Sequence, residues 1–197
     1  RRHTNFSMEA IEQTWNGTSD STGRCTATIS RNGDLVHRMY LQIKGTATGS
    51  KTMQSANATA VGITSVELEI GGQKIDKHSG QWMETYAELT EPNPTGTTAT
   101  HAVAGDGTLF QNMSGMGGVD GSVAAYTITV PLQFWFCRNP GLALPLIALQ
   151  YHEVKVIMNH TMGASTTMDG SNTNNLWCDY IYLDTDERRR FAQVSHE

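Results

Sequence analysis

Apolar and polar residues alternate with a period of two in several short segments, and this pattern predicts β-strands that each bury one face. The clearest example is 35–44, where His37 lies on the apolar side and Arg38 and Gln42 lie opposite. The apolar positions of this strand are Leu35, Met39, Leu41 and Ile43. We expect the strand to line a hydrophobic core.

The segment 66–75 predicts a tight hairpin. In 66–70, branched apolar residues alternate with two glutamates, and Gly71 and Gly72 follow directly. Glycine adopts the positive φ angles that two-residue hairpin turns require, so we expect 73–75 to return as the second strand.

A third alternating run predicts a long strand across 126–136, with 133–137 as a core strand. Pro131 interrupts this run. Because proline cannot donate a backbone hydrogen bond, we expect an edge position or a bulge there. Further strands are predicted at 25–30, 154–158 and 177–183.

Two segments have helical patterns. In 81–89, aromatic and leucine residues recur at helical spacing, with Ser79 as the expected N-cap and Pro92 as the expected stop. A short apolar helix is expected at 144–150, after the break at 139–141. Segments rich in Gly, Thr, Asn and Ser predict long surface loops at 46–62, 93–122 and 160–175.

Many short strands, turn signals between them and the lack of a regular strand–helix alternation indicate an all-β protein. We predict a jelly-roll β-sandwich of two antiparallel sheets, with short helices in the inter-strand loops. The length of 197 residues fits one domain, and a hydrophobic fraction of 38% is too high for a disordered chain.

The net charge of −5 argues against direct coating of nucleic acid, because neutralising phosphates needs clustered Lys and Arg. The dense basic cluster 188–190 follows acidic residues in 184–187, and we interpret it as a solvated or interdomain ion-pair surface. Cys25, Cys137 and Cys178 are odd in number, which favours free thiols, although one bridge with a spare cysteine also fits. The sequence holds no stretch of about 18 apolar residues, so we predict no membrane span.

We predict no catalytic, cofactor-binding or metal-binding residues. His152, Glu153 and His160 come nearest to the ligand set of metal-binding jelly rolls, but no H-x-H pair accompanies them. The polar segment 169–172 lacks the bidentate glutamate of a calcium loop, and the glycine-rich segment 115–121 lacks the register of a phosphate-binding loop. A cupin-like metalloenzyme is therefore the least supported interpretation.

Five asparagines begin N-x-Ser/Thr triplets and are weak glycosylation candidates. Such triplets arise by chance in a chain rich in Thr and Asn, and they matter only in a secretory pathway. The candidates are Asn5, Asn16, Asn57, Asn112 and Asn159.

Four tryptophans could line a sugar-binding surface, but packing in the core or at a subunit interface is the more common role of such side chains. They are Trp15, Trp82, Trp135 and Trp177.

Five blocks of the sequence resemble, in order, the major capsid proteins of nucleocytoplasmic large DNA viruses. The longest and most specific block is PLQFWFCRNPGLALPLIALQYH at 131–152. The others are RRHTNFSME at 1–9, GDLVHRMYL at 33–41, VELEIGGQKID at 66–76 and DYIYLDTDERRRFAQ at 179–193. The phycodnavirus, iridovirus and giant-virus branch is the most similar.

The resemblance implies a double jelly-roll subunit, in which 1–187 is the N-terminal jelly roll and 188–197 starts the linker to a second jelly roll that is missing here. A short arm before Arg1 is also expected from the family pattern. Such a protein is structural and not an enzyme, and it needs no cofactor. Its homotrimers form pseudo-hexagonal capsomers of an icosahedral shell around double-stranded DNA.

The resemblance further implies that the partners are copies of the same protein, neighbouring capsomers and minor capsid proteins, without direct contact to nucleic acid. The expected location is the virion capsid, after assembly in the host cytoplasm. An alternative from another class is a jelly-roll carbohydrate-binding attachment domain, which the polar loops and tryptophans would suit. Trimers of the complete protein would favour the capsid interpretation, and saturable binding to a glycan array would favour the alternative.

Overall fold

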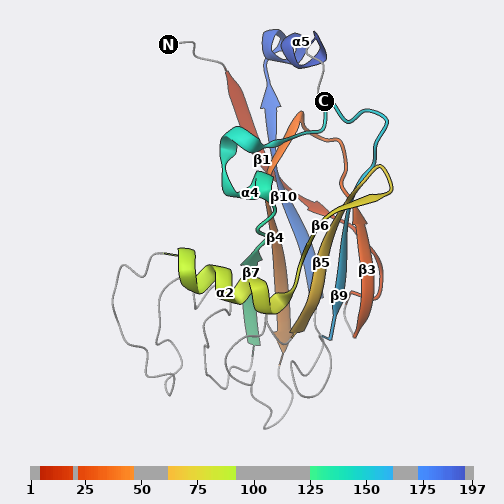
Figure 1. Ribbon diagram of the computed structural model, residues 1–197, viewed down its shortest axis with the longest axis vertical. Helices are drawn as coiled ribbons and strands as arrows, with labels where there is room; N and C mark the ends of the chain where they lie inside the picture. The colour runs from red at the N-terminus through yellow and green to blue at the C-terminus, as the bar shows by residue number, and fades with distance from the viewer. Residues whose placement is uncertain (1–4, 20–21, 47–61, 92–124, 162–172, 194–197) are drawn as a thin grey trace.

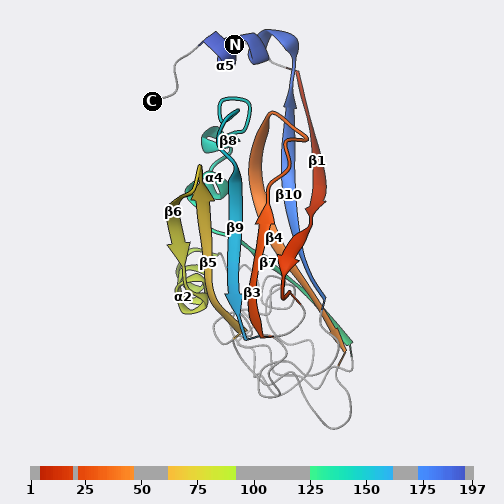
Figure 2. The ribbon, with the colours of Figure 1, turned by 90° about the vertical axis from the view of Figure 1, so that its right-hand side faces the viewer.

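The strands form two antiparallel sheets that pack face to face (Figures 1 and 2). The computed structural model describes residues 5–19, 22–46, 62–91, 125–161 and 173–193. Sheet A has the order β1 (Phe6–Gln13), β10 (Thr173–Leu183), β4 (Leu35–Thr46) and β7 (Ala125–Pro131), and β8 (Leu144–Pro145) also pairs with β4. Sheet B has the order β2 (Trp15–Gly17), β3 (Gly23–Thr28), β9 (Val154–His160), β5 (Ile63–Ile70) and β6 (Gln73–His78).

The chain passes repeatedly from one sheet to the other, and every strand pair is antiparallel. This topology confirms the predicted jelly-roll β-sandwich. The helices lie outside the two sheets, as expected for inter-strand connections (Figure 1). Among the described residues they are α2 (Gly80–Thr90), α4 (Trp135–Arg138), the short 3-10 helix η1 (Pro140–Leu142) and α5 (Thr185–Gln193).

The core lies between the sheets and consists of the inward-facing residues of both. Sheet A contributes Met39 and Leu41, and sheet B contributes Leu68 and Met158, all fully buried. Each large apolar side chain removed from water stabilises the fold by about 1.5–3 kcal/mol, so this layer supplies most of the driving force.

Strand β4 departs from the predicted alternation at one point. Met39 pairs with Cys178, whereas the next inward pair is Val36 with Tyr180, because the register shifts between Cys178 and Tyr180. Met39 and Val36 are therefore consecutive inward residues of β4 although they are three positions apart, whereas their partners on β10 are two positions apart. The extra residue on β4 forms a β-bulge. Val36 joins the core cluster at this point, whereas Leu35 is buried, as predicted, but lies outside that cluster.

The prediction of a core strand at 133–137 is also wrong. Strand β7 ends at Pro131, and α4 follows after three residues. Leu132, Phe134 and Phe136 are nevertheless all buried, so burial keeps a period of two without a strand. The expected edge position is correct, because β4 is the strand that pairs with β7 and no second partner occurs among the described residues.

The helix predicted at 144–150 is absent, and these residues form β8 and a series of turns. Leu144 pairs with Val36, so its backbone joins sheet A instead of a helix. The guanidinium of Arg31 then donates to the carbonyl groups of Leu149 and Gln150. These long-range contacts outweigh a weak local helical preference.

The hairpin and the first helix are confirmed. Gly71 and Gly72 have φ angles of 59° and 82° and connect β5 to β6. The Ser79 hydroxyl accepts a hydrogen bond of 3.1 Å from the Trp82 N–H and caps α2. Pro92 and most of the predicted loops at 46–62, 93–122 and 160–175 lie outside the described residues.

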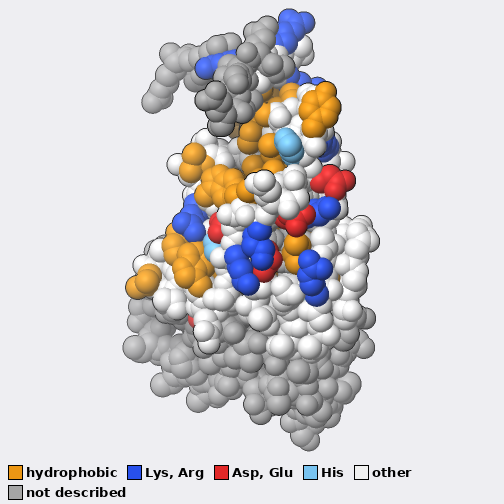
Figure 3. Space-filling view, turned by 45° about the vertical axis from the view of Figure 1, so that its right-hand side comes forward, with side chains coloured by type: hydrophobic (Ala, Val, Ile, Leu, Met, Phe, Trp, Pro, Cys, Tyr) orange, Lys and Arg blue, Asp and Glu red, His pale blue; other side chains and the backbone are white. Residues whose placement is uncertain are grey.

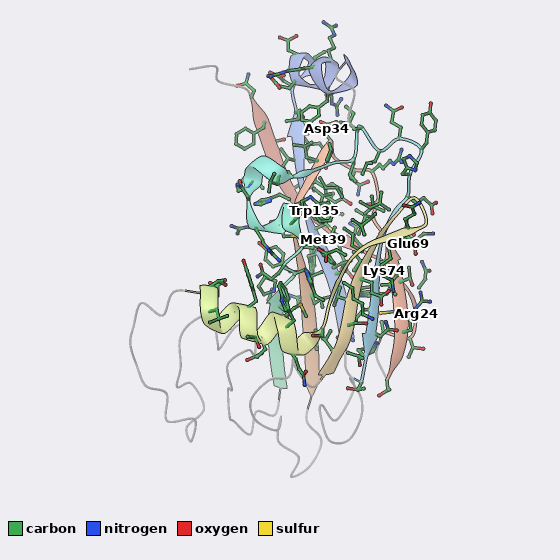
Figure 4. The ribbon with its side chains drawn as sticks, viewed as in Figure 1. Arg24, Asp34, Met39, Glu69, Lys74 and Trp135 are labelled. Carbon is green, nitrogen blue, oxygen red and sulfur yellow. The ribbon has the colours of Figure 1, made fainter. Side chains whose placement is uncertain are left out.

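Asp34 ties together the end of the sandwich that carries α5 (Figure 4). Its side chain is only 5% exposed and accepts from the Leu183 N–H at 2.8 Å and from Arg188 Nε at 2.9 Å and 3.0 Å. Its backbone N–H donates to the Ile181 oxygen, and its own oxygen accepts from the Ile147 N–H. The start of β4, the end of β10 and α5 are thus held by one residue.

We expect Asp34→Ala to lower the free energy of unfolding by about 2–3 kcal/mol, because it leaves a buried N–H without its charged acceptor. Arg188→Gln should cost clearly less, since the guanidinium is half-exposed and water screens the pair. Urea denaturation of both variants measures the difference. If both variants lost the same free energy of unfolding, the ion pair with Arg188, and not the hydrogen bond from the buried Leu183 N–H, would be the main contribution of Asp34 to stability.

Candidate assembly surface

The outer face of sheet B carries a network of alternating charges. Glu67 forms ion pairs with Lys74 at 2.7 Å and with Lys77 at 3.1 Å, and Lys155 pairs with Glu153 at 3.0 Å. The hydrogen bond from Lys74 lowers the pKa of Glu67, against the opposing effect of burial. Acidic and basic side chains lie together on this face (Figure 3), which is typical of a surface in contact with water.

The outer face of sheet A is different and carries an apolar groove of about 500 Å³. It follows from the register of β1 and β10, which places Phe6 opposite Leu183 and Met8 opposite Ile181. Phe6 is 64% exposed and Met8 is 51% exposed. Pro140 of η1 closes one side of the groove.

An antiparallel sheet that faces water on one side normally carries polar residues there. Clustered exposed apolar side chains instead mark a surface that contacts another protein. We therefore define the groove lined by Phe6, Met8, Pro140, Ile181 and Leu183 as the candidate assembly surface.

Three polar residues, His37, Arg38 and Asp179, also line the groove. The Tyr40 hydroxyl donates to Asp179 Oδ2 at 3.4 Å, and burial raises the pKa of Asp179. His37 is buried, and its Nδ1 lies 3.0 Å from the Phe136 backbone oxygen. The groove therefore combines an apolar rim with hydrogen-bonding groups that can orient a partner.

Sequence reasoning missed β1, β2 and α5. The signal for β1 is present, because Phe6 and Met8 alternate with Ser7 and Glu9 in period two. Phe6 and Met8 face outward, whereas Ile11 packs against the core, so a search for core residues alone does not assign the strand correctly.

The residues weighed as metal ligands do not come together. His152 precedes β9 and His160 ends it, so the length of the strand separates them. The Nε2 atom of His160 lies 2.9 Å from the Thr18 oxygen. Within the described ranges, no three His, Cys, Asp or Glu residues are placed to hold a metal ion. The segments 115–121 and 169–172 lie outside those ranges.

The three cysteines are free thiols, as their odd number favours. Burial raises the pKa of Cys25 to about 12 and that of Cys137 to about 12, and it also raises the pKa of Cys178. A thiol with such a pKa is a poor nucleophile at neutral pH.

The sequon asparagines occupy unequal positions, and their glycosylation stays a prediction. Asn5 and Asn16 are exposed, and Asn5 directly precedes β1. Asn159 is half-buried in β9 and donates to Ser65 Oγ at 3.0 Å, so its amide is already engaged. Asn57 and Asn112 lie outside the described residues.

The tryptophan rings pack largely within the protein. Trp82 stacks on His78 at 4.2 Å and on Tyr86 at 5.0 Å between ring centroids. Trp135 contacts Phe136 edge-on, and the Trp177 indole N–H donates to Gln42. Trp15 packs against the core. Stacking on a sugar ring needs a free aromatic face, which the contacts of Trp82 leave little room for.

The fold is a jelly-roll β-sandwich with an exposed apolar groove on the outer face of sheet A. The family model described as the N-terminus of the major capsid protein matches residues 1–184, and this chain belongs to that family.

Relatives agree with this assignment. The major capsid protein of Pyramimonas orientalis virus is 50% identical over 216 residues, covering all of this chain and 49% of the relative. That of Paramecium bursaria Chlorella virus 1 is 38% identical over 206 residues, covering all of this chain and 44% of the relative. The chain thus spans about half the length of the curated relatives it matches.

Solved structures give the same result. The crystal structure of PBCV-1 VP54, fitted into a reconstruction of the virophage Sputnik, matches with a TM-score of 0.79 and 36% identity over all of this chain and 47% of that chain. The Faustovirus major capsid protein, at 11% identity and a TM-score of 0.62 over 97% of this chain and 57% of that chain, shares the fold. In the described part of the chain, no helix has the length and apolar composition for crossing a bilayer.

Acidification should destabilise the protein through His78. This ring is buried between Trp82 and Phe134, and burial lowers its pKa, helped by Arg138 and opposed by Asp76. The unfolded chain therefore binds a proton more readily than the folded protein. Stability is fully present above the ordinary histidine pKa of about 6.5 and decreases as the pH falls from there through the lower folded pKa.

The measurement is the free energy of unfolding between pH 7.5 and pH 5 for the wild type and for His78→Phe, which keeps the stack but cannot titrate. The wild type should lose stability relative to the variant as the pH falls. Other titrating groups cancel in this difference. Parallel curves would show that His78 does not titrate differently on folding.

Proposed function

We propose that this chain is the N-terminal jelly roll of a major capsid subunit and that it builds the shell of a large double-stranded DNA virus. The observation that carries the proposal is the apolar groove on the outer face of sheet A. A jelly roll that worked alone in water would gain nothing from this exposed surface. A subunit that packs against another β-sandwich would bury it.

The architecture of the whole subunit follows from the same proposal. Because the relatives are about twice as long, a second jelly roll follows this one, with 1–187 as the first domain and 188–197 as the start of the linker. Helix α5 spans this boundary, so the connection begins as a helix held to the sandwich by Arg188 and Asp34.

Three such subunits would form a trimer with pseudo-hexagonal outline, and trimers would tile the icosahedral shell. One of the similar solved structures is a quasi-atomic model of the PBCV-1 virus capsid, which supports assembly of this kind. Copies of the same subunit, neighbouring capsomers and minor capsid proteins are the partners. The protein would assemble in the host cytoplasm and reside in the virion capsid.

The role that we propose is structural, and the relatives named as major capsid proteins support it. The net charge of −5 opposes direct binding of the genome, because like charges repel.

Substitution at the groove should weaken the trimer of the full-length protein. Met8→Asp places a charge in the apolar groove, whereas Ile75→Asp makes the same kind of change on β6 at a side chain of equal exposure, 51% against 50%. We expect Met8→Asp to raise the trimer dissociation constant at least about tenfold, because a buried unpaired charge is costly at an interface. Ile75→Asp should leave it unchanged.

Mass photometry over a concentration series measures the trimer fraction, and circular dichroism checks that both variants fold. A wild-type protein that stays monomeric would contradict the capsid role. Equal weakening by both substitutions would contradict the assignment of the groove as the assembly surface.

A further inference from the structure

A second concavity, distinct in chemistry from the apolar groove, lies between α2, α4 and the β7 edge of sheet A. Its volume is about 460 Å³. Its lining includes two guanidinium groups, from Arg38 of β4 and Arg138 of α4, together with the side chains of Tyr40 and Gln133. Glu91 is the single acidic residue among the described residues that line it. We call this concavity the arginine cleft.

Three contacts hold the Arg138 guanidinium in place. Its guanidinium carbon lies 4.8 Å from the ring centroid of Tyr86 and 5.4 Å from that of Trp82. Its Nε donates to the Gln133 backbone oxygen at 2.9 Å. Cation–π contacts and one hydrogen bond therefore orient the group while its two terminal nitrogens keep their donors.

Arg38 lines the same cleft from β4. Its Nη1 lies 3.5 Å from the Tyr40 hydroxyl, which in turn donates to Asp179. Burial raises the pKa of the Cys137 thiol to about 12, although the charges of Arg138 and Arg38 both act to lower it. The charges of both arginines therefore act on the same neutral thiol, which lines the cleft.

Neither arginine forms an ion pair within 4.0 Å among the described residues, although the charge of Asp179, which Tyr40 links to Arg38, offsets part of the positive charge. Bringing two like charges together costs free energy unless an anion lies between or beside them. A guanidinium presents parallel N–H donors whose spacing matches the two oxygens of a carboxylate. The cleft therefore has both the charge and the geometry of an oxyanion site.

We propose that the arginine cleft binds a carboxylate side chain of an acidic peptide segment from a neighbouring protein chain. Glu91 at the rim disfavours a doubly charged phosphate more than a singly charged carboxylate. A sugar would need free aromatic faces, whereas Arg138 already covers those of Trp82 and Tyr86. The site goes beyond the proposed shell-building role; it shares Arg38 with the apolar groove, so Arg138→Gln is the variant confined to the cleft.

The test is isothermal titration of the full-length protein with a hexaglutamate peptide at low ionic strength. We expect saturable binding that Arg38→Gln and Arg138→Gln each weaken about tenfold, the scale of one lost charge-assisted pair. Arg38→Gln leaves the stack of Arg138 on the aromatic rings intact, so it separates loss of charge from loss of packing. Tryptophan fluorescence, to which Trp82 beside Arg138 contributes, provides a second measurement of peptide binding.

Arg24→Gln is the matched control, because it removes the same charge from an exposed position on β3, in the other sheet (Figure 4). It should change the affinity less than twofold. No binding of hexaglutamate to the folded wild type, or equal weakening by the Arg24 variant, would overturn the proposal. Inorganic phosphate that binds as tightly and displaces the peptide would overturn the choice of a carboxylate. Trimer formation, measured in parallel, reports separately on the proposed function.

Discussion

The antiparallel pairing of β4 with β10 is the interaction on which the other features of the sandwich depend. These strands have 12 and 11 residues and lie side by side in the middle of sheet A. Their inner faces supply Met39 and Tyr180 to the core, and their outer faces supply Arg38 and Ile181 to the groove. Because side chains alternate strictly along a strand, a shift of one residue would exchange these two sets.

The bulge in this pairing links the core to the surface. It lies opposite Asp179 and lets Val36 and Met39 both face inward although they are three residues apart. His37 and Arg38, which lie between them, can then both line the outer groove. Bulges commonly direct side chains in this way, and here the result joins β4 to α4 through the contact of His37 with Phe136.

The outer surfaces differ in chemistry and therefore in the partner that each suits. The charge network on sheet B satisfies itself, since its acidic and basic groups pair within the chain. The groove on sheet A exposes apolar side chains that no described residue covers. The arginine cleft has oriented positive charge without an acidic partner in ion-pair range. Burial of apolar area suits a permanent contact, and a charged cleft contributes specificity and register to it.

The sequence by itself determined the features that local physics controls. Gly71 makes the turn of the β5–β6 hairpin, and Ser79 caps α2, because a positive φ angle and an N-cap bond involve only neighbouring residues. The ordered sequence blocks also identified the family, and period-two alternation identified the sandwich. The tertiary structure alone decided where the 126–136 run ends, because burial in the core and pairing in a sheet produce the same alternation. It also decided the groove and the Asp34 contacts, which join residues far apart in the sequence: Asp34 and Arg188 are separated by 154 positions. No local pattern specifies such pairs, since they arise only when β10 pairs with β4 and with β1 in one sheet.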